Sequence, residues 1–334
     1  MREIIYSRLL DGQLEKLKEF CRLNWGKEHP LIHNKAVFDW YYRVDDHINM
    51  VIAYAKETEQ DIEILGVCGY IPTNSSSNPD VFLSYILSKK GEKFGISLRL
   101  IEYIKKITNA RTINCNNIRK NTSGIYHFLG YTVADMKHFY RLNEDISEYT
   151  LCLINNYQPK SIMEYDLTCE IVEKASQLRG FQFANFSNNL PYKDEGYVTR
   201  RYLEYIFHKY IILHVDNNNH QALIIVRKIE YQNHVMFRVV DFIGDISLIG
   251  KSGRILDSLM KQYSAEYIDW YSYNISEAVM QQAGFTLALN GDTNIIPFYL
   301  QPPVMEEMDV TVFVSNDKTI MFRADGDQDR PNLG

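Results

Sequence analysis

The sequence lacks the features that mark several large classes of protein. No stretch approaches the roughly 20 consecutive apolar residues that a membrane-spanning helix needs. The opening residues, 1–8, also lack the apolar run of a secretory signal peptide. We therefore expect a cytoplasmic protein without a membrane span.

The sequence also has few cysteines and no large excess of charge of one sign. The five cysteines are an odd number, are widely spaced and form no C-x-x-C pair: Cys21, Cys68, Cys115, Cys152 and Cys169. This spacing argues against a disulfide framework or a structural zinc site, so no metal is expected. A formal net charge of -6 gives no general attraction to nucleic acid or to an anionic membrane, so neither is expected as a partner.

Apolar and aromatic residues, by contrast, are plentiful, at 46% and 13% of the 334 residues. A chain of this length is too long for one ordinary core, and two domains are the natural expectation. In the first half, apolar periodicity predicts helices at 11–25, 35–42, 96–107 and 122–129, and strands at 49–54, 62–71, 81–87, 112–115 and 130–136. In the second half it predicts helices at 167–178, 200–208, 253–263 and 276–283, and strands at 210–215, 222–228, 235–243 and 267–271.

The two halves share an order of elements. Each has a strand, a glycine-bearing loop, a helix, a strand, a short helix and then a glycine followed by an aromatic residue. Gly130-Tyr131 in the first half corresponds to Gly284-Phe285 in the second. This weak symmetry suggests a tandem duplication, with domains at 1–148 and 149–334.

One strand-turn-helix junction carries a motif suited to a phosphate group. Residues 90–95 read Lys-Gly-Glu-Lys-Phe-Gly between the strand at 81–87 and the helix at 96–107. Such a junction aims several backbone N–H groups at one point, as a pyrophosphate requires. An ordinary strand-helix turn remains the alternative for the loop taken alone.

Residues 81–131 resemble the GNAT acetyltransferase superfamily. Its fingerprint is a basic residue or Gln, two further residues, Gly, one residue, and Gly or Ala; Lys93 departs from it, standing where the family usually has Gly. The resemblance implies an α/β fold of two tandem GNAT-like domains, each a mixed, mostly antiparallel sheet flanked by helices. It implies acetyl-CoA, or another acyl-CoA, as co-substrate, bound by Ile86, Leu87, Ser88, Lys90, Gly91, Lys93, Phe94, Gly95, Ile96 and one or more of Asn116, Asn117 and Asn121.

The same resemblance points to a general acid. In the family a Tyr four residues before a Gly-aromatic pair protonates the thiolate as coenzyme A leaves, and Tyr126 stands four residues before Gly130. Ordinary packing of a tyrosine is the alternative. In the second half this position is Met280, whose thioether cannot donate a proton. We therefore expect the chemistry in the first half alone.

Aromatic and titratable residues gather where GNAT folds place the mouth of the acceptor site. Trp25, Trp40 and Tyr85 are expected to bind the acceptor, and His29 is the candidate general base because its pKa lies near working pH. A helix-capping histidine among packed tryptophans is the alternative, and Glu63, Tyr85 and His127 are other candidate bases. A homodimer is compatible with the sequence.

The function implied is transfer of an acyl group from acyl-CoA to an amine. The acidic segment 323–332 is similar to tails of tandem GNAT-like proteins from surface-polysaccharide loci, which favours an amino sugar, free or nucleotide-linked, as acceptor. A solvated terminus is the simplest interpretation of that tail, although Arg330-Pro331 could dock back. Two alternatives stay open: an aminoacyl-tRNA-dependent peptidoglycan-type transferase, and a non-catalytic binding protein with a decayed cofactor loop.

Overall fold

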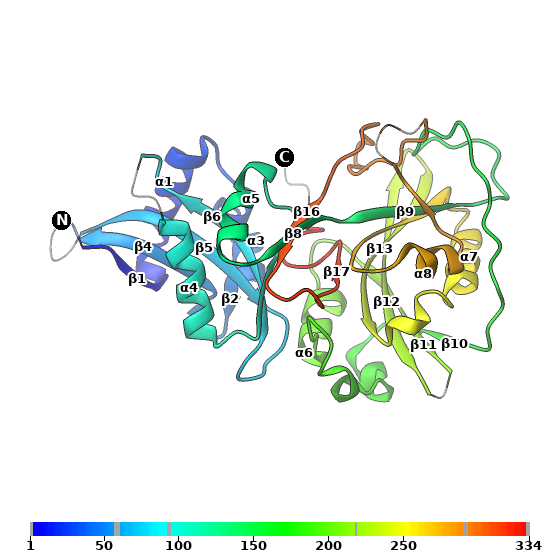
Figure 1. The fold of residues 1–334 in the computed structure, drawn as a ribbon, viewed down its shortest axis with the longest axis horizontal. Coiled ribbons are helices and arrows are strands. Elements are labelled where there is room, and N and C mark those ends of the chain that lie inside the picture. Colours follow the sequence, from blue (N-terminus) through cyan, green and yellow to red (C-terminus); the bar gives the residue numbers. More distant parts are fainter. Residues whose placement is uncertain are drawn as a thin grey trace. The chain divides into compact units, whose positions relative to one another are not determined.

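The computed structural model describes residues 3–56, 61–91, 95–217, 219–289, 291 and 293–331. Contacts divide the described chain into two units (Figure 1), the first formed by residues up to 133 with 313–317, and the second by residues 134–312 with 318–331. The sequence places a boundary at 148, whereas the compact units divide near 133 and exchange a segment close to the C-terminus.

The first unit is built on a seven-stranded sheet in the order β1-β4-β5-β6-β7-β16-β8. The strands are β1 (Ile5–Arg8), β4 (Met50–Lys56), β5 (Ile62–Pro72), β6 (Asp80–Ser88), β7 (Thr112–Cys115), β8 (Thr132–Asp135) and β16 (Thr311–Val314), beside a small hairpin of β2 (Arg43–Val44) and β3 (His47–Ile48). The helices are α1 (Leu14–Trp25), α2 (Pro30–His33), α3 (Lys35–Tyr42), α4 (Ile96–Thr108) and α5 (Ser123–Phe128).

Helix α4 shows why the sequence folds in this way. Its apolar residues recur at helical spacing, and Ile96, Leu100, Ile101 and Ile104 are buried against the sheet. Leu98 is only half-buried, whereas Leu100 is fully buried. The amphipathic pattern therefore identifies the helix correctly.

The second unit repeats the arrangement in a sheet ordered β10-β11-β12-β13-β14-β9-β15, with β17 pairing with β14. Its strands are β9 (Lys137–Leu142), β10 (Thr168–Val172), β11 (Tyr210–Asp216), β12 (Gln221–Tyr231), β13 (His234–Gly244), β14 (Tyr267–Tyr273), β15 (Thr286–Leu287) and β17 (Met321–Phe322). Its α-helices are α6 (Glu195–Val198), α7 (Gly253–Gln262) and α8 (Glu277–Gln282).

Each sheet is completed by a strand that is distant in sequence from its neighbours in the sheet. In the first sheet β16, from late in the chain, lies between β7 and β8, with Phe313 opposite Cys115. In the second sheet β9 takes the corresponding place between β14 and β15, with Phe139 opposite both Trp270 and Leu287. The common strand order confirms the expected fold class: two tandem α/β units, each a mixed sheet flanked by helices.

Two helices expected in the second half are wrong. Residues 167–178 form the edge strand β10 and a 3₁₀ turn at Ala175–Gly180, because β-branched Thr168, Ile171 and Val172 pair well along β11. The helix expected at 200–208 ends early: α6 passes into a π-helical turn at Thr199–Leu203. There Arg201 is buried and donates to the carbonyl oxygens of Ala324 and Gln328, a tertiary contact that periodicity does not reveal.

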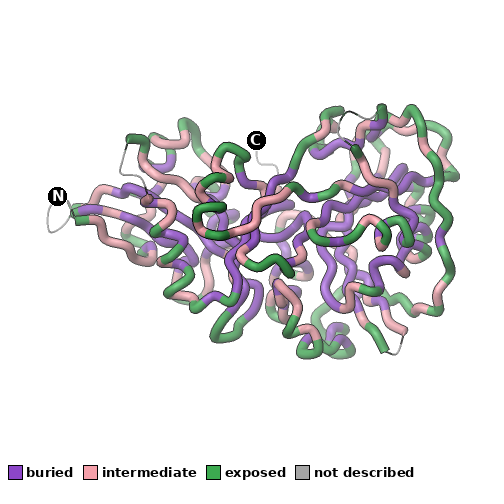
Figure 2. The backbone as a smooth tube through the Cα atoms, in the orientation of Figure 1, coloured by how far each residue is buried: buried purple, intermediate pink, exposed green. Residues whose placement is uncertain are grey.

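The acidic tail is not solvated, contrary to the simplest expectation from its composition. Every residue from 321 to 329 is buried (Figure 2), and Asp325 is 0% exposed. Its carboxylates are compensated by cations of the second unit, including Lys193 and Arg227. Cations that are distant in sequence therefore allow the acidic tail to be buried, although its own charge favours exposure to solvent.

Candidate functional site

The candidate site of the first unit begins where β6 and β7 part. They pair in parallel from Asp80 and Thr112 to Leu83 and Cys115, where β7 ends, while β6 continues to Ser88. In the described part of the chain, no strand pairs with residues 84–88 on the β7 side. A strand edge of this kind offers unpaired N–H and C=O groups to an extended ligand. The predicted residues Ile86, Leu87 and Ser88 lie on this edge.

A β-bulge at Tyr85 shapes the same edge. Gly69 pairs with Ser84 and Cys68 pairs with Ile86, so Tyr85 is the extra residue, and its φ is 23°. Tyr42 hydrogen-bonds Ser84 (2.6 Å between hydroxyls), and a Cβ at Gly69 would lie 2.5 Å from the Tyr42 ring. Glycine at 69 therefore lets Tyr42 pack beneath the bulge. A bulge re-aims backbone groups, and such features are common beside active sites.

The turn after β6 leads into the N-terminus of α4. Gly91 (φ 80°) and Gly95 (φ 107°) are left-handed, and Gly95 caps the helix directly before Ile96. Among the described residues, a Cβ on either glycine would meet no atom within 4 Å, so packing by this part of the chain does not require either glycine. The amides of the first turn of α4 are aligned with the positive end of the helix dipole. The described part of the turn fits an anionic group; the predicted Lys93 and Phe94 lie outside the described residues.

Tyr126 is held rigidly in the first unit. It is buried on α5, and its ring stacks on Phe313 of β16 at 4.2 Å between centroids and 25° between planes. Burial raises the pKa of the Tyr126 phenol, with a smaller opposing effect of the Thr122 hydrogen bond. The phenol therefore stays protonated at neutral pH and can donate a proton. The contact with Phe313 could not be predicted from the sequence, because a short strand rich in β-branched residues does not indicate which side chains it packs against.

Three predicted acceptor-site residues come together in the structure. The ring centroids of Trp25, His29 and Tyr85 lie 4.8–5.6 Å apart. Arg119 adds a guanidinium 4.5 Å from the Trp25 ring centroid, a contact for which the sequence carries no signal. Burial raises the pKa of Tyr85 well above its usual range, and it raises the pKa of its hydrogen-bond partner Cys21 to about 12. Neither group ionises near neutrality.

His29 also caps a helix. Its Nδ1 accepts the Leu31 N–H at 3.2 Å at the start of α2. A neutral His29 in this geometry has its Nδ1 lone pair engaged and carries its proton on Nε2. It would need the other tautomer to act as a base through Nε2.

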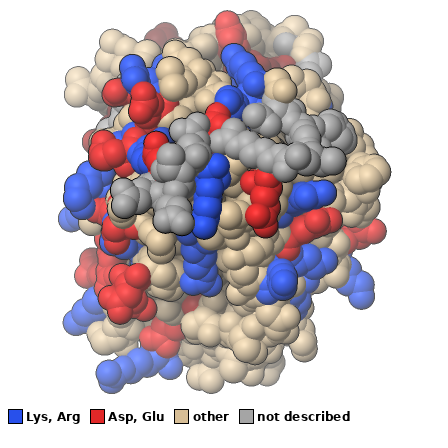
Figure 3. Space-filling view, turned by 90° about the vertical axis from the view of Figure 1, so that its left-hand side faces the viewer, with Lys and Arg blue, Asp and Glu red and all other residues tan. Residues whose placement is uncertain are grey.

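The remaining predicted residues are more dispersed. Trp40 is half-buried on α3, and its place in the acceptor site stays a prediction. Of the three asparagines, Asn116 is buried and Asn121 is exposed, while Asn117 adopts a left-handed φ of 58° just after β7. Glu63 is engaged with Lys89. The face of the molecule in Figure 3 shows basic and acidic side chains interspersed.

The second unit reproduces the backbone of the Tyr126 turn with a different side chain. Tyr131 N–H donates to the Tyr126 carbonyl at 3.0 Å, and Phe285 N–H donates to the Met280 carbonyl at the same distance. The glycine between, at 130 or 284, is left-handed in both units. Met280 thus occupies the place of Tyr126, fully buried and without a proton to donate.

Comparison with known proteins places the chain by its fold. No family model matches it, and no curated protein matches its sequence. Solved structures do match along most of its length. A GCN5-related N-acetyltransferase from Anabaena variabilis ATCC 29413 has a TM-score of 0.57 at 9% identity, covering 93% of this chain and 72% of that chain. One from Kribbella flavida has a TM-score of 0.54 at 8% identity, covering 94% and 71%.

A third solved structure agrees with these two. A conserved protein of unknown function from Enterococcus faecalis V583, described as a probable N-acyltransferase, has a TM-score of 0.54 at 9% identity, covering 86% of this chain and 70% of that chain. At such identities the likeness establishes the fold. The chain has the tandem GNAT fold that residues 81–131 suggested. Within the described residues, no helix is long and apolar enough to cross a membrane.

Proposed function

We propose that this chain, with its tandem GNAT fold, is an acyl-CoA-dependent N-acyltransferase whose chemistry is confined to the first unit. The observation that carries the proposal is the open edge of β6 at residues 84–88. It follows a β-bulge, leads into a helix N-terminus and shares its unit with a buried, protonated tyrosine. No other described part of the chain combines these features.

The first unit would hold acyl-CoA through its backbone. The edge at Ile86–Ser88 would hydrogen-bond the amides of the pantetheine arm, and the turn at Lys90–Gly95 with the first turn of α4 would bind the pyrophosphate. When bound, acyl-CoA supplies an activated thioester carbonyl. The glycines leave room for that approach, because a Cβ on Gly91 or Gly95 would lie within 4 Å of no atom in the described part of the chain.

In the reaction, a neutral amine attacks the thioester carbonyl carbon, a C–N bond forms and the C–S bond breaks. The departing thiolate takes the phenolic proton of Tyr126, which is later restored from the proton released by the amine. Because the Nδ1 lone pair of His29 is engaged by Leu31, we propose that this proton leaves the acceptor through water. His29 Nε2–H would then orient that water.

We propose an amino sugar as the acceptor. The ring cluster of Trp25, His29 and Tyr85, with Arg119 over Trp25, offers apolar ring faces beside a cation, a combination suited to stacking a sugar and binding an attached phosphate. An aminoacyl-tRNA-dependent transferase is less well supported, since the longest described helix is α4 with 13 residues and no long helical arm is present among the described residues.

The test combines binding with turnover. Calorimetry with acetyl-CoA should show binding; no heat at about 1 mM ligand would overturn the proposal. With glucosamine as acceptor, Tyr126→Phe should lower kcat about 100-fold or more and leave the KM for acetyl-CoA nearly unchanged. Tyr131→Phe is the matched control, because its ring also stacks on Phe313, at 5.4 Å. Equal decreases in kcat for the two variants would show that Tyr126 is not the general acid.

A further inference from the structure

The second sheet splays as the first does, but the space between its two diverging strands is filled. We call this space the second slot. β13 and β14 pair in parallel from Phe237 and Ile268 to Val239 and Trp270 and then separate. Beyond that point Ser272 and Tyr273 of β14 pair with the two residues of β17. On the other side, Ala324 N–H donates to the carbonyl oxygen of Val240 at 2.8 Å. One segment of chain therefore hydrogen-bonds both diverging strands.

The residue that accepts this bond is the counterpart of Tyr85. Ile225 pairs with Asp241 and Val226 with Val239, so Val240 is the extra residue of a β-bulge in β13. In the first unit, the equivalent bulge lies on the open edge. The tail thus bonds the backbone at the position that corresponds to the proposed acyl-CoA edge. We call residues 319–330 the C-terminal clasp.

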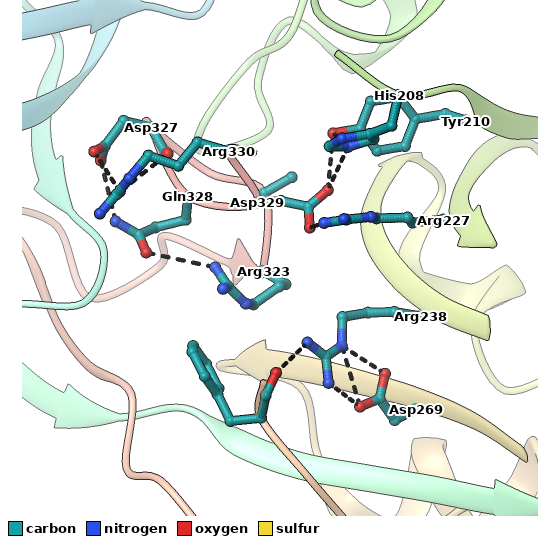
Figure 4. A network of polar contacts seen from close by, with 12 residues as sticks. His208, Tyr210, Arg227, Arg238, Asp269, Arg323, Asp327, Gln328, Asp329 and Arg330 are labelled. Carbon is teal, nitrogen blue, oxygen red and sulfur yellow. Dashed lines mark hydrogen bonds and ion pairs between the residues drawn. The ribbon is translucent and has the colours of Figure 1, made fainter. Parts of the chain in front are cut away.

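Buried ion pairs anchor the clasp at two points (Figure 4 shows the second). Lys193 lies 2.6 Å from Asp325 and also pairs with Asp241, and all three side chains are 3% exposed or less. Asp329 receives Arg227 at 2.6 Å, together with hydrogen bonds from Tyr210 and His208. Charges buried this deeply stay in place only while each has its partner. The clasp is therefore a fixed part of the second unit.

The loop that corresponds to the phosphate turn is closed as well. It lies between β13 and α7, and five of its amides already donate to oxygens within the loop: Ser247, Leu248, Ile249, Lys251 and Ser252. Gly253, the first residue of α7, is required by packing, because a Cβ there would lie 2.5 Å from the Ala283 carbonyl oxygen, while a Cβ at Gly250 would lie 2.5 Å from the flexible amide end of Gln282. In the first unit the glycines face open space. The second loop thus has few amides left for a phosphate.

We propose that the C-terminal clasp is a built-in occupant of the second slot, taking the place of a pantetheine arm and closing that slot to acyl-CoA. The chain then binds one acyl-CoA, in the first unit, a count that rests on the proposed function. The inference that the second slot is closed depends only on the contacts within the second unit. The tail is thereby an internal ligand that turns a duplicated binding fold into a structural support.

Two measurements on the full chain test the proposal. Calorimetric titration with acetyl-CoA should give one equivalent per chain. Hydrogen exchange should show slow amides at Phe322 and Ala324, bonded to Asp325 and Val240, and their rates should not change with saturating acetyl-CoA. Two equivalents, or faster exchange of residues 321–329 on adding acetyl-CoA, would overturn the closed slot.

The outcomes separate this inference from the proposed function. Zero equivalents with slow exchange at Phe322 and Ala324 would refute acyl-CoA binding in the first unit and support the clasp. One equivalent with fast exchange in the clasp would support the first-unit site and refute the clasp as a fixed occupant. Gly95→Ala should weaken binding at least about 10-fold by placing a strained methyl in the turn, whereas Gly12→Ala, also in open space, should not.

Discussion

Asp329 is the most sensitive point of the C-terminal clasp. Its carboxylate is 2% exposed and receives Arg227, Tyr210 and His208 (Figure 4). Asp329→Asn preserves the shape of the side chain but removes the negative charge, and its amide N–H groups would face donors. Arg227, whose side chain is 16% exposed, is then left as a largely buried cation without its main counter-charge.

The expected cost follows from that geometry. Removing one partner of a buried ion pair destabilises by about 3–5 kcal/mol, whereas an exposed pair contributes about 0–1 kcal/mol. Burial alone would raise the pKa of Asp329, but Arg227 and His208 lower it well below its usual range. A carboxyl with a depressed folded pKa stabilises above its unfolded pKa of about 4 and loses that contribution as pH falls through the folded pKa. The gap between wild type and variant should therefore shrink below about pH 4.

Hydrogen exchange read by mass spectrometry measures this loss locally. Peptides covering 319–331 should exchange about 10²–10⁴-fold faster in Asp329→Asn at neutral pH. Glu277→Gln is the control, because its partner Lys137 and Glu277 itself are 49% and 43% exposed. An effect of Asp329→Asn no larger than that of the control would show that the ion pair does not hold the clasp.

Two further predictions concern the second unit. Burial raises the pKa of Asp325 to about 6, although Lys193 opposes the rise, so wild-type stability should fall by about 3 kcal/mol as pH rises from 4 to 6, because the unfolded chain loses this proton in that range while the folded chain keeps it. Asp325→Asn should abolish that decline in urea unfolding; an equal decline in the variant would contradict the assignment. Gly253→Ala should destabilise by about 1–3 kcal/mol, because its methyl would meet the Ala283 carbonyl, while Gly124→Ala, with open space around it, should be neutral or stabilising by thermal unfolding.

Local periodicity predicted most of the first unit. Helix 35–42 and strand 112–115 have the predicted bounds, and α4 differs by one residue, because each is specified by its own buried stripe. The sequence could also indicate the equivalence of Tyr126 and Met280, since both precede a left-handed glycine that the turn requires. These features depend on residues within a few positions of one another.

What the sequence could not reveal depends on partners far along the chain. Phe313 beneath Tyr126 and Arg119 over Trp25 are contacts between segments that no local pattern connects. The tail misled for the same reason: its carboxylates suggest solvent, and only the fold supplies Lys193 and Arg227 beside them. Charge composition predicts burial poorly where opposite charges meet through tertiary structure.

The late position of β16 along the chain also governs how the first unit can be made. Ile113 N–H donates to Ser315 Oγ across 202 positions, so the first sheet stays incomplete until residue 315 has left the ribosome. A gene fragment ending at residue 148 would encode β7 and β8 without the strand that joins them. The first unit cannot complete its sheet early in synthesis, and it must tolerate an open sheet edge until β16 arrives.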